Sequence, residues 1–528
     1  MRGLLKSLAT VSGLTMLSRL LGFVRQLIMA GLIGASGTPV ADAFMVAFRL
    51  PNMFRRLLAE GAFQAAFIPL FQGAENEAGR EEAMRFAEDI LAWLVVILTS
   101  LSALVMIFTP LAFTILTTGF TDDPERFNLA VFYGRIMFPY LACMSVVGLY
   151  GGMLNAIGRF AVAAAAPLLL NICLISAMVI TARSGAAGTG LGLSVAVLAA
   201  GVSQLLFLIY GAARSELLLR LRLPRFTAGA KRMVTLGTPG FIAASALQVN
   251  GIVGTNIASR AEQGANSWLF YADQLYQLPL AMIGIALGIV LMPAISRAVK
   301  SGNETEARRT LEQGFLTAMV FALPAAAGLS ILGSFIAEAL FQDLAGLVTG
   351  VFGAGGSAFN DRDVEMVGIT LLIYGLGVPA FVLQKVLAAA FFAREDTKTP
   401  MRFALTAIVI NAAVSIGLFP TIGFLSVPTG TILASWTEVS LLALTLGRRN
   451  LFSVGHLVRR LAAIVAATAA MAGGLHVLVG YRPAIEGILF GQSWLALFAV
   501  ALCGGAVFGV LAFLLGGVRI TDLKRARG

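Results

Sequence analysis

The sequence has little charge for its length. Asp, Glu, Lys and Arg make up 12% of its 528 residues, about half the share that is usual in soluble globular proteins, whereas 58% of the residues are hydrophobic. The mean hydropathy is +0.88. This balance excludes a soluble domain and predicts a protein that crosses a membrane many times.

Residues that hold metals and form disulfides are also scarce. The three cysteines, Cys143, Cys173 and Cys503, lie inside apolar segments, and the two histidines lie apart from one another. We therefore expect buried free thiols, without a disulfide framework and without a bound metal or other cofactor.

Sequence motifs of catalysis are absent as well. The chain contains none of the patterns GxxxxGK[ST], GxSxG, HExxH and CxxC, which serve phosphate binding, acyl transfer, zinc binding and thiol chemistry. We therefore predict that the protein is not an enzyme and that ATP does not drive it directly.

Long apolar runs take up most of the chain. A helix needs about 20 mostly apolar residues to cross a bilayer, so the sequence predicts an all-α polytopic membrane protein with about fourteen transmembrane helices. Their expected ranges are 8–33, 40–71, 86–118, 129–156, 161–182, 188–214, 233–259, 266–296, 311–341, 366–392, 401–421, 425–447, 457–480 and 491–517. Leu50-Pro51 lies inside the second range and predicts a kink or break there.

Lys and Arg are distributed unevenly among the predicted loops. Most of them fall at the two ends of the chain and in every second loop, which the positive-inside rule assigns to the cytoplasm. The alternate, outer loops hold few cations: Arg126, Arg183, Arg260, Arg362 and Arg482. Their acids, Asp363 among them, we expect on a solvated surface. Both termini are thus predicted to be cytoplasmic, and the net charge of +11 needs no nucleic acid partner.

Within the predicted spans, cations gather in the first two. The intramembrane cations are Arg19, Arg25, Arg49, Arg55, Arg56, Arg135 and Lys385. The first two spans hold only Asp42 and Glu60 as acids. An arginine at the bilayer centre costs at least about 2.5–3.5 kcal/mol on insertion scales, so such residues usually face a cavity or a partner. The surplus of cations predicts a positively charged, water-filled cavity that receives an anion.

The two arginines of the first span are six positions apart, about 120° from eclipsed around a helix. We expect Arg19 and Arg25 to line two sides of one cavity or to meet different partners. The alternative is that one of them extends to the cytoplasmic surface. Arg135 lies near the outer end of its helix, where reaching the surface is the favoured interpretation.

In the second span, Arg55 and Arg56 follow Pro51 and, being adjacent, cannot share one helix face. We expect Arg55 to contact the ligand, and Arg56 to be structural or to pair with Glu60 one turn later.

Three further charged residues have more than one interpretation. Asp42 opens the second span, where an acid either favours the helix dipole as a cap or serves the site. Arg49 faces lipid, headgroups or the cavity, depending on the kink. Lys385 lies in the middle of a later span and is a further candidate.

Short patterns recur at a spacing of about 230 residues, the length of six predicted helices. Leu50-Pro51 recurs as Leu278-Pro279, and Asp42 as Asp273. Copies of six helices have the same orientation, and parallel repeats place a substrate site at their interface. We therefore predict a six-helix bundle at 1–215, a basic cytoplasmic linker at 216–232, a second six-helix bundle at 233–450, and two additional helices with a basic tail at 451–528.

Longer motifs resemble one known family. They are Ser18-Arg19-Leu20-Leu21-Gly22-Phe23-Val24-Arg25, Ala41-Asp42-Ala43-Phe44, Leu50-Pro51-Asn52 with Arg55-Arg56, Ala59-Glu60-Gly61-Ala62-Phe63, Tyr271-Ala272-Asp273 and Asp396-Thr397-Lys398-Thr399-Pro400. Through them the whole chain resembles the lipid II flippase family MurJ, also called MviN, of the multidrug/oligosaccharidyl-lipid/polysaccharide exporter superfamily.

The resemblance implies a flippase in the bacterial inner membrane that moves lipid II, the undecaprenyl-pyrophosphate-linked peptidoglycan precursor, to the periplasmic leaflet. It implies transport roles for Arg19, Arg25, Arg55 and Asp42 in a cationic cavity, and a groove for the polyprenyl tail at the last two helices. The partners that it implies are lipid II, membrane lipids and other proteins of cell-wall synthesis. Guanidinium groups suit a pyrophosphate because they stay charged and donate two parallel hydrogen bonds.

One departure from the family concerns the eighth helix. The family often has an arginine directly after Tyr-Ala-Asp and an acid three residues later, where this chain has Gln274 and Gln277. We interpret the two amides as a joint replacement of an ion pair, and we keep Asp273, Gln274 and Gln277 among the candidate site residues. The cavity then depends more on the first two helices.

Other functions account for parts of the pattern. A flippase of another lipid-linked oligosaccharide, such as an O-antigen or exopolysaccharide unit, predicts the same fold and is disfavoured only by the motifs and the two extra helices. A cation-coupled drug exporter needs intramembrane acids, and a scaffold without transport leaves the arginines unexplained. Alternating access between the two bundles is the mechanism that we expect.

Overall fold

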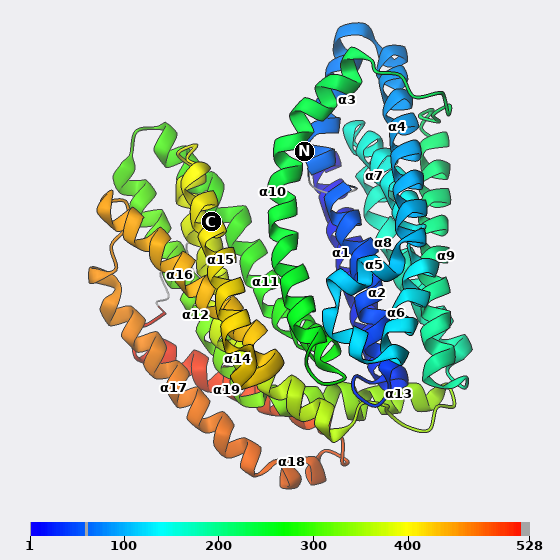
Figure 1. The fold of residues 1–528 in the computed structure, drawn as a ribbon. Helices are drawn as coiled ribbons and strands as arrows, with labels where there is room; N and C mark the ends of the chain where they lie inside the picture. The colour runs from blue at the N-terminus through cyan, green and yellow to red at the C-terminus, as the bar shows by residue number, and fades with distance from the viewer. Residues whose placement is uncertain (1, 59–61, 519–528) are drawn as a thin grey trace. The chain divides into compact units, whose positions relative to one another are not determined.

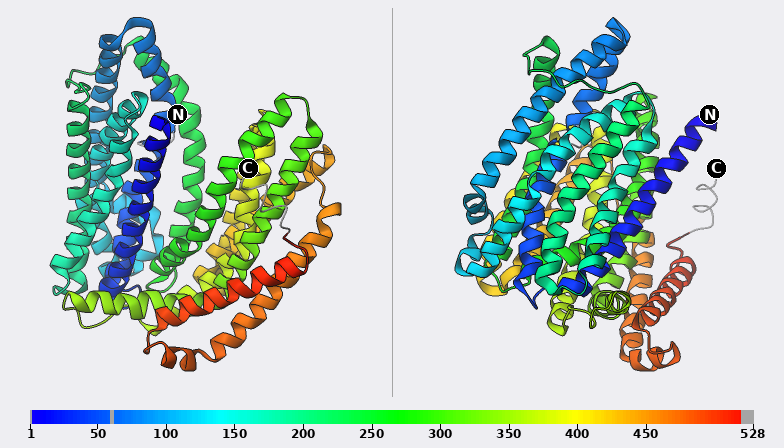
Figure 2. Two further views of the ribbon diagram at one scale, coloured as in Figure 1. Left: turned by 180° about the vertical axis from the view of Figure 1, so that it is seen from behind. Right: turned by 90° about the vertical axis from the view of Figure 1, so that its right-hand side faces the viewer.

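The computed structural model describes residues 2–58 and 62–518, and over these residues the secondary structure is helical, without a strand. The all-α prediction is confirmed. Contacts divide the chain into two units, which are Met1–Ser267 with Ala345–Phe359 (unit 1) and Trp268–Leu344 with Asn360–Gly528 (unit 2). Figures 1 and 2 show long helices running alongside one another within each unit.

Unit 1 holds the first ten helices and one short later one. They are α1 (Arg2–Ile33), α2 (Pro39–Leu58), α3 (Ala62–Ala78), α4 (Arg80–Ile107), α5 (Thr109–Leu116), the 3₁₀ turn η1 (Thr118–Asp122), α6 (Pro124–Met137), α7 (Tyr140–Ala156), α8 (Phe160–Thr181), α9 (Gly185–Ala213), α10 (Ala228–Ser259) and α13 (Ala345–Val351).

Local sequence explains several helix ends in unit 1. α2 and α6 begin at Pro39 and Pro124, where the missing N–H of proline leaves no hydrogen bond unmade. Asp123 caps α6, since its side chain accepts a hydrogen bond from the Arg126 amide at 3.1 Å. The helix expected at 40–71 is represented by α2 and α3, and residues 59–61 between them lie outside the described part of the chain.

Unit 2 holds the remaining helices. They are α11 (Ala265–Lys300, which begins in unit 1), α12 (Glu304–Ala337), the π-helical segment η2 (Glu338–Leu344), α14 (Asp361–Phe392), α15 (Lys398–Ile422), the 3₁₀ turn η3 (Gly423–Leu425), α16 (Ser426–Arg448), the 3₁₀ turn η4 (Gly455–Leu457), α17 (Val458–Gly480), α18 (Arg482–Ile488) and α19 (Ser493–Leu514).

Small residues allow α12 and α14 to pack closely. A Cβ atom built on Gly333 of α12 would lie 2.7 Å from the carbonyl oxygen of Gly368 on α14. A Cβ atom on Gly368 would lie 2.1 Å from Ser334 Oγ. These distances leave no room for a side chain, so the contact requires glycine, as at many helix interfaces in lipid.

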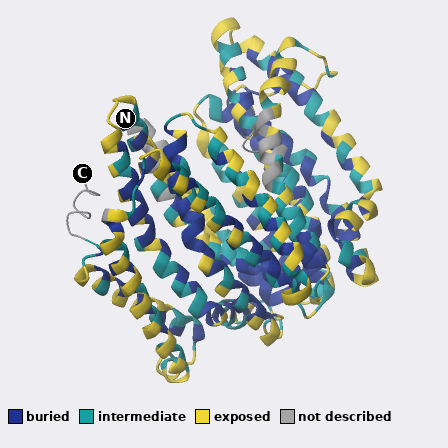
Figure 3. Ribbon diagram, turned by 60° about the vertical axis from the view of Figure 1, so that its left-hand side comes forward, coloured by how far each residue is buried: buried dark blue, intermediate teal, exposed yellow. Residues whose placement is uncertain are grey.

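Exposed and buried residues alternate along the helices (Figure 3), and many of the exposed residues are large and apolar. α19 exposes Phe498, Leu502 and Val510 while it buries Val500 and Phe508. A helix that is apolar on every side suits a lipid environment. The exposed face of α19 therefore needs no further protein to cover it.

Ten segments of the described residues are long and apolar enough to cross a membrane. The expected count of fourteen spans is therefore not confirmed, although one of the ten, Lys398–Arg448, contains both α15 and α16. α2 is not among the ten, because Asp42, Arg49, Arg55 and Arg56 interrupt its 20 residues.

The two C-terminal helices, α17 and α19, pack along each other and are joined by α18 (Figure 2). Arg482 at the start of α18 donates hydrogen bonds from both Nη atoms to Glu338 at 2.6 Å each, and from Nε to Glu486 at 2.5 Å. These bonds, first those to Glu338, raise the pKa of Arg482. Its guanidinium also lies 4.4 Å from the centroid of the Phe335 ring. Arg482 thus fastens the C-terminal helix pair to α12 and η2.

Replacing this arginine should loosen the C-terminal pair. Arg482→Ala is expected to lower the free energy of unfolding by about 1–3 kcal/mol, because a partly buried bidentate pair is lost and Glu338 keeps its charge without this partner. Thermal unfolding of the purified protein measures the change. The control is Arg362→Ala, since Arg362 pairs with Glu365 at 3.4 Å with both side chains more than half exposed. Equal losses in the two variants would contradict the assignment.

Candidate functional site

Arg19 and Arg25 lie on different faces of α1. α1 packs against α8, where Asn171 Nδ2 donates to the backbone carbonyl of Ser18 at 3.0 Å and Gly22 lies on the same face. Arg25, two helical turns after Ser18, returns to this face and is half-buried, whereas Arg19 is exposed. One guanidinium therefore lies at a packed face and the other on an open face.

Gln26, the neighbour of Arg25, is a polar residue that the sequence patterns did not single out. Its side chain is 4% exposed, and within the described structure neither its amide oxygen nor its amide nitrogen has a hydrogen-bond partner. Buried amides without partners are rare in native proteins. The sequence offers one signal that could have identified Gln26, because this amide directly precedes the apolar run 27–33.

The arginines of α2 occupy its second half. Arg55 is half-buried, and its Nε donates to Asn52 Oδ1 one turn earlier at 3.1 Å. Arg56 is exposed, and Glu60, its expected partner, lies outside the described residues. Arg49 lies against α10, since a Cβ atom on Gly251 would be 3.1 Å from Arg49 Nη2. The glycine therefore makes room for the Arg49 guanidinium.

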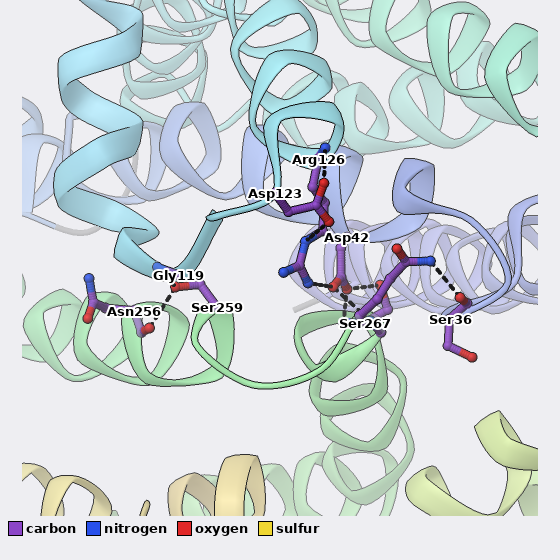
Figure 4. A network of polar contacts seen from close by, with 10 residues as sticks. Ser36, Asp42, Gly119, Asp123, Arg126, Asn256, Ser259 and Ser267 are labelled. Atoms are coloured by element: carbon purple, nitrogen blue, oxygen red, sulfur yellow. Dashed lines mark hydrogen bonds and ion pairs between the residues drawn. The ribbon is translucent and has the colours of Figure 1, made fainter. Parts of the chain in front are cut away.

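Asp42 lies at the opposite end of α2 and is fully buried. Its carboxylate accepts hydrogen bonds from Gly264 N at 2.8 Å, from Ser267 N at 2.9 Å and from Ser267 Oγ at 2.6 Å (Figure 4). Gly264 and Ser267 flank the first turn of α11, so Asp42 caps that helix from a distant part of the chain. Gly264 has a φ of 100°, a conformation that glycine adopts with little strain.

This burial bears on the two interpretations of Asp42, as a helix cap and as a site residue. About 20 Å of helix axis separates Asp42 from Arg55, which is more than one pyrophosphate group can bridge. The carboxylate is also fully enclosed by its donors. In this structure the carboxylate is occupied by these hydrogen bonds, and a contact of Asp42 with the ligand stays a prediction. Asp42 is a helix cap, as one interpretation expected, but the helix that it caps is α11 instead of its own.

Arg126, expected in an outer loop, lies in the first turn of α6 and is 6% exposed. Its Nη1 atom is 3.4 Å from Asp42, and its Nε atom is 3.1 Å from Asp123 (Figure 4). Its guanidinium also lies 4.4 Å from the centroid of the Phe120 ring. The sequence signal for this position was Asp123-Pro124, a capping residue followed by a proline at the first helical position.

Further hydrogen bonds hold the end of α10 and the loop that follows it. Gln263 Nε2 donates to the carbonyl of Ser36 at 2.7 Å, and Gly119 N donates to Ser259 Oγ at 3.2 Å. Arg260 Nε donates to Thr118 Oγ1 at 2.9 Å. All of these groups lie on the side that is predicted to be outer. We call these contacts, together with those of Asp42, the outer latch; its residues are Ser36, Asp42, Thr118, Gly119, Arg126, Ser259, Arg260, Gln263, Gly264 and Ser267.

Unit 2 has a counterpart to the contact between Asp42 and Arg126. Trp268 in the first turn of α11 donates from Nε1 to Asp363 in the first turn of α14 at 2.7 Å. Asp363 is fully buried and forms a capping box with Asn360, so the expectation of a solvated acid there is wrong. In both units a first-turn residue of one helix is thus bonded to a first-turn residue two predicted spans later.

The remaining candidates lie in unit 2. Gln277 Nε2 donates to Asp273 one turn away on α11, while Gln274 is half-buried. Gln277 is therefore bonded to Asp273, and the joint replacement of an ion pair by Gln274 and Gln277 stays an interpretation. Lys385 of α14 is exposed, and a Cβ atom on Gly284 of α11 would be 2.9 Å from its Nζ atom.

The motif from Asp396 to Pro400 forms a helix start. Asp396 accepts hydrogen bonds from Thr399 N at 3.0 Å, from Thr399 Oγ1 at 2.8 Å and from Arg449 Nη1 at 2.9 Å. These bonds, first that of Arg449, hold the pKa of Asp396 below its usual range. The motif thus connects α14 and α15 as a structural cap. In the described part of the chain, no group of three or more His, Cys, Asp and Glu residues could hold a metal ion.

Comparison with known proteins gives a consistent result. A family model described as lipid II flippase MurJ matches residues 29–490. A protein of Rhizobium meliloti (strain 1021) named probable lipid II flippase MurJ is 39% identical over 537 residues, which cover 99% of this chain and 96% of the relative. A lipid II flippase MurJ of Burkholderia cenocepacia is 34% identical over 482 residues, which cover 90% of each chain.

Solved structures show the same fold. The chain is similar to lipid II flippase MurJ in an inward closed conformation, with a TM-score of 0.76, 22% identity, and coverage of 94% of this chain and 98% of the other. It is also similar to an inward-facing MATE family transporter of the MOP superfamily, with a TM-score of 0.65, 15% identity, and coverage of 84% and 98%.

Removing the charge of Asp42 should destabilise unit 1. Asp42→Asn replaces a carboxylate that caps α11 and faces Arg126, so the free energy of unfolding is expected to fall by about 2–4 kcal/mol. Thermal unfolding checks this value. The control is Asp122→Asn, since Asp122 is exposed at the end of η1 and its change should stay within about 0.5 kcal/mol. Unchanged stability of Asp42→Asn would show that the carboxylate does not hold this loop.

Proposed function

This chain belongs to the lipid II flippase MurJ family, and from that premise we propose that it moves lipid II from the cytoplasmic to the periplasmic leaflet of the bacterial inner membrane, with both of its termini in the cytoplasm. Lipid II is the substrate that the relatives' names print. The observation that carries the proposal is the set of guanidinium groups on two helices that follow each other in the chain, with Arg19 and Arg25 on α1 and Arg49, Arg55 and Arg56 on α2.

Arg19, Arg25 and Arg55 are the residues that we propose for binding the pyrophosphate. Each guanidinium keeps its charge and offers parallel donors to phosphate oxygens. Asn52 supports this role for Arg55, because Arg55 Nε donates a hydrogen bond to Asn52 Oδ1, which orients the guanidinium group. Gln26 is an additional donor and acceptor next to Arg25.

Alternating access is the mechanism that we propose. The outer latch closes the outer side while the arginines receive the headgroup from the cytoplasm. Opening toward the periplasm then requires the hydrogen bonds from Gly264 and Ser267 to Asp42 to break. In this scheme Asp42 affects transport by stabilising the closed state, while the arginines bind the substrate.

The polyprenyl tail can remain in lipid while the headgroup crosses. α17 and α19 expose apolar side chains along their length, among them Val477, Phe498 and Val510. We propose that these helices guide the tail. The bonds of Arg482 to Glu338 support this role, because they hold the helix pair against α12 and η2.

Complementation tests the arginines and the substrate together. In cells depleted of their own lipid II flippase, the wild-type chain is expected to restore growth, whereas Arg19→Ala, Arg25→Ala and Arg55→Ala should lower transport about tenfold or more at normal protein abundance. Loss of one charged hydrogen-bond pair, about 1.5–3 kcal/mol, accounts for a factor of that size. Transport of lipid II in spheroplasts from these cells provides the direct measurement.

Two sets of controls separate the outcomes. Arg85→Ala should be neutral, since Arg85 is exposed on α4 and pairs with Glu81 of the same helix at 2.7 Å. Lysine at positions 19, 25 and 55 should retain part of the activity through its charge. Full activity of the three alanine variants would overturn the arginine assignment. Failure of an inserted wild-type chain would favour another lipid-linked oligosaccharide as substrate.

A further inference from the structure

The segment that joins α9 to α10 is held against α4 by hydrogen bonds and an ion pair, yet several of its apolar side chains are exposed. It runs from Arg214 to Thr227 without helical structure. Figure 1 shows it passing beside one end of α4. We call residues 214–232 the linker strap; it comprises this segment and the first turn of α10.

Three side chains of α4 hold the strap in place. Glu88 is buried, accepts a hydrogen bond from Arg220 N at 3.0 Å, and pairs with Arg222 Nε at 2.7 Å. Arg80 Nη2 donates to the carbonyl of Ser215 at 2.7 Å. Trp93 Nε1 donates to the carbonyl of Arg225 at 3.0 Å. The strap is therefore an ordered part of unit 1, with a definite inner and outer face.

The first half of the strap alternates between buried and exposed residues. Ser215, Leu217 and Leu219 are buried, whereas Leu218 and Arg220 are exposed. This period of two is that of an extended chain with one face against protein. The opposite face must therefore meet whatever surrounds the protein.

The outer face of the strap is apolar at several positions. Leu218 is 55% exposed, Leu221 68%, Leu223 83% and Phe226 81%. The Phe226 ring lies 4.5 Å from that of Trp93, so an aromatic pair borders the same face. A group of apolar side chains that are this exposed marks a surface that contacts another molecule or a membrane.

Cations lie between these apolar groups. The exposed basic residues of the strap are Arg214, Arg220, Arg222, Arg225, Lys231 and Arg232, and its only acid is Glu216. Of these cations, only Arg222 is in an ion pair in the described structure, with Glu88. Interleaved Leu, Phe, Trp and Arg are typical of segments that lie in the headgroup region of an anionic bilayer.

We propose that the linker strap is an interfacial membrane anchor, which inserts Leu221, Leu223 and Phe226 below the headgroups and binds anionic phospholipid headgroups through its arginines and lysine. Charge complementarity selects this occupant, because the cytoplasmic leaflet is negatively charged. The inference uses the orientation proposed above but not the choice of substrate. It gives the chain between the two predicted bundles a fixed depth at the cytoplasmic surface.

A fluorescent label on the strap tests this placement. The full chain, with its three native cysteines replaced by alanine and carrying Leu223→Cys, is labelled with an environment-sensitive fluorophore and placed in nanodiscs. The nanodiscs contain either phosphatidylcholine alone or phosphatidylcholine with an equal part of phosphatidylglycerol. In the anionic nanodiscs, brominated acyl chains should quench the label strongly, and acrylamide, an uncharged quencher in the water, should quench it about twofold less than in neutral nanodiscs or at high salt.

Charge variants separate specific binding from general attraction. Arg225→Gln, Lys231→Gln and Arg232→Gln together remove three strap cations that do not contact Glu88, and they should return acrylamide quenching to its value in neutral nanodiscs. The matched control removes the same charge elsewhere, by Lys300→Gln, Arg402→Gln and Arg459→Gln, at exposed residues of other predicted cytoplasmic segments. The control should behave as the parent chain does.

Other outcomes would overturn the proposal. Equal acrylamide quenching in anionic and neutral nanodiscs would show a strap in water. A label protected from acrylamide without quenching by brominated chains would show that protein, such as a second copy of this chain, covers it. Labelling of the same cysteine from outside intact cells by an impermeant maleimide would overturn the orientation, and a failed complementation with correct labelling would concern the substrate alone.

Discussion

A charged side chain placed among apolar helices needs a partner or water, and most charged residues of this chain follow from that constraint. Arg126 is buried between Asp42 and Asp123, and Glu88 is buried against the basic segment before α10. Each of these ions would be costly alone. In each pair the opposite charges offset the free-energy cost of burial, and the ion pair connects parts of the chain that are distant in sequence.

Helix N-termini provide the other set of partners. Asp42, Asp363 and Asp396 each accept hydrogen bonds from backbone amides at the start of a helix, where amides have no partner within the helix itself. Asp42 differs from the other two because the helix that it caps begins more than 200 positions later in the chain. This bond is one reason why α10 and the start of α11 belong to unit 1.

The cations of α1 and α2 have a different role in our proposal. Asp42, the one acid within α1 and α2, is enclosed at the far end of α2. The division of labour that we propose follows directly: acids connect helices, and arginines attract the anionic substrate. The same division separates this chain from transporters of organic cations, which need acids in the translocation path.

Composition and local pattern were enough to predict an all-α membrane protein, a surplus of arginine in its first two spans and its family, because hydropathy, charge and motifs are properties of neighbouring residues. The roles of Asp42, Arg126 and Asp363 were not predictable in this way. Asp42 meets Ser267, and Trp268 meets Asp363, across long stretches of chain, and both acids look like solvated helix starts from their neighbours alone. Whether such an acid lies in water or caps a distant helix depends on which helices pack beside it, and that is decided only by the tertiary structure.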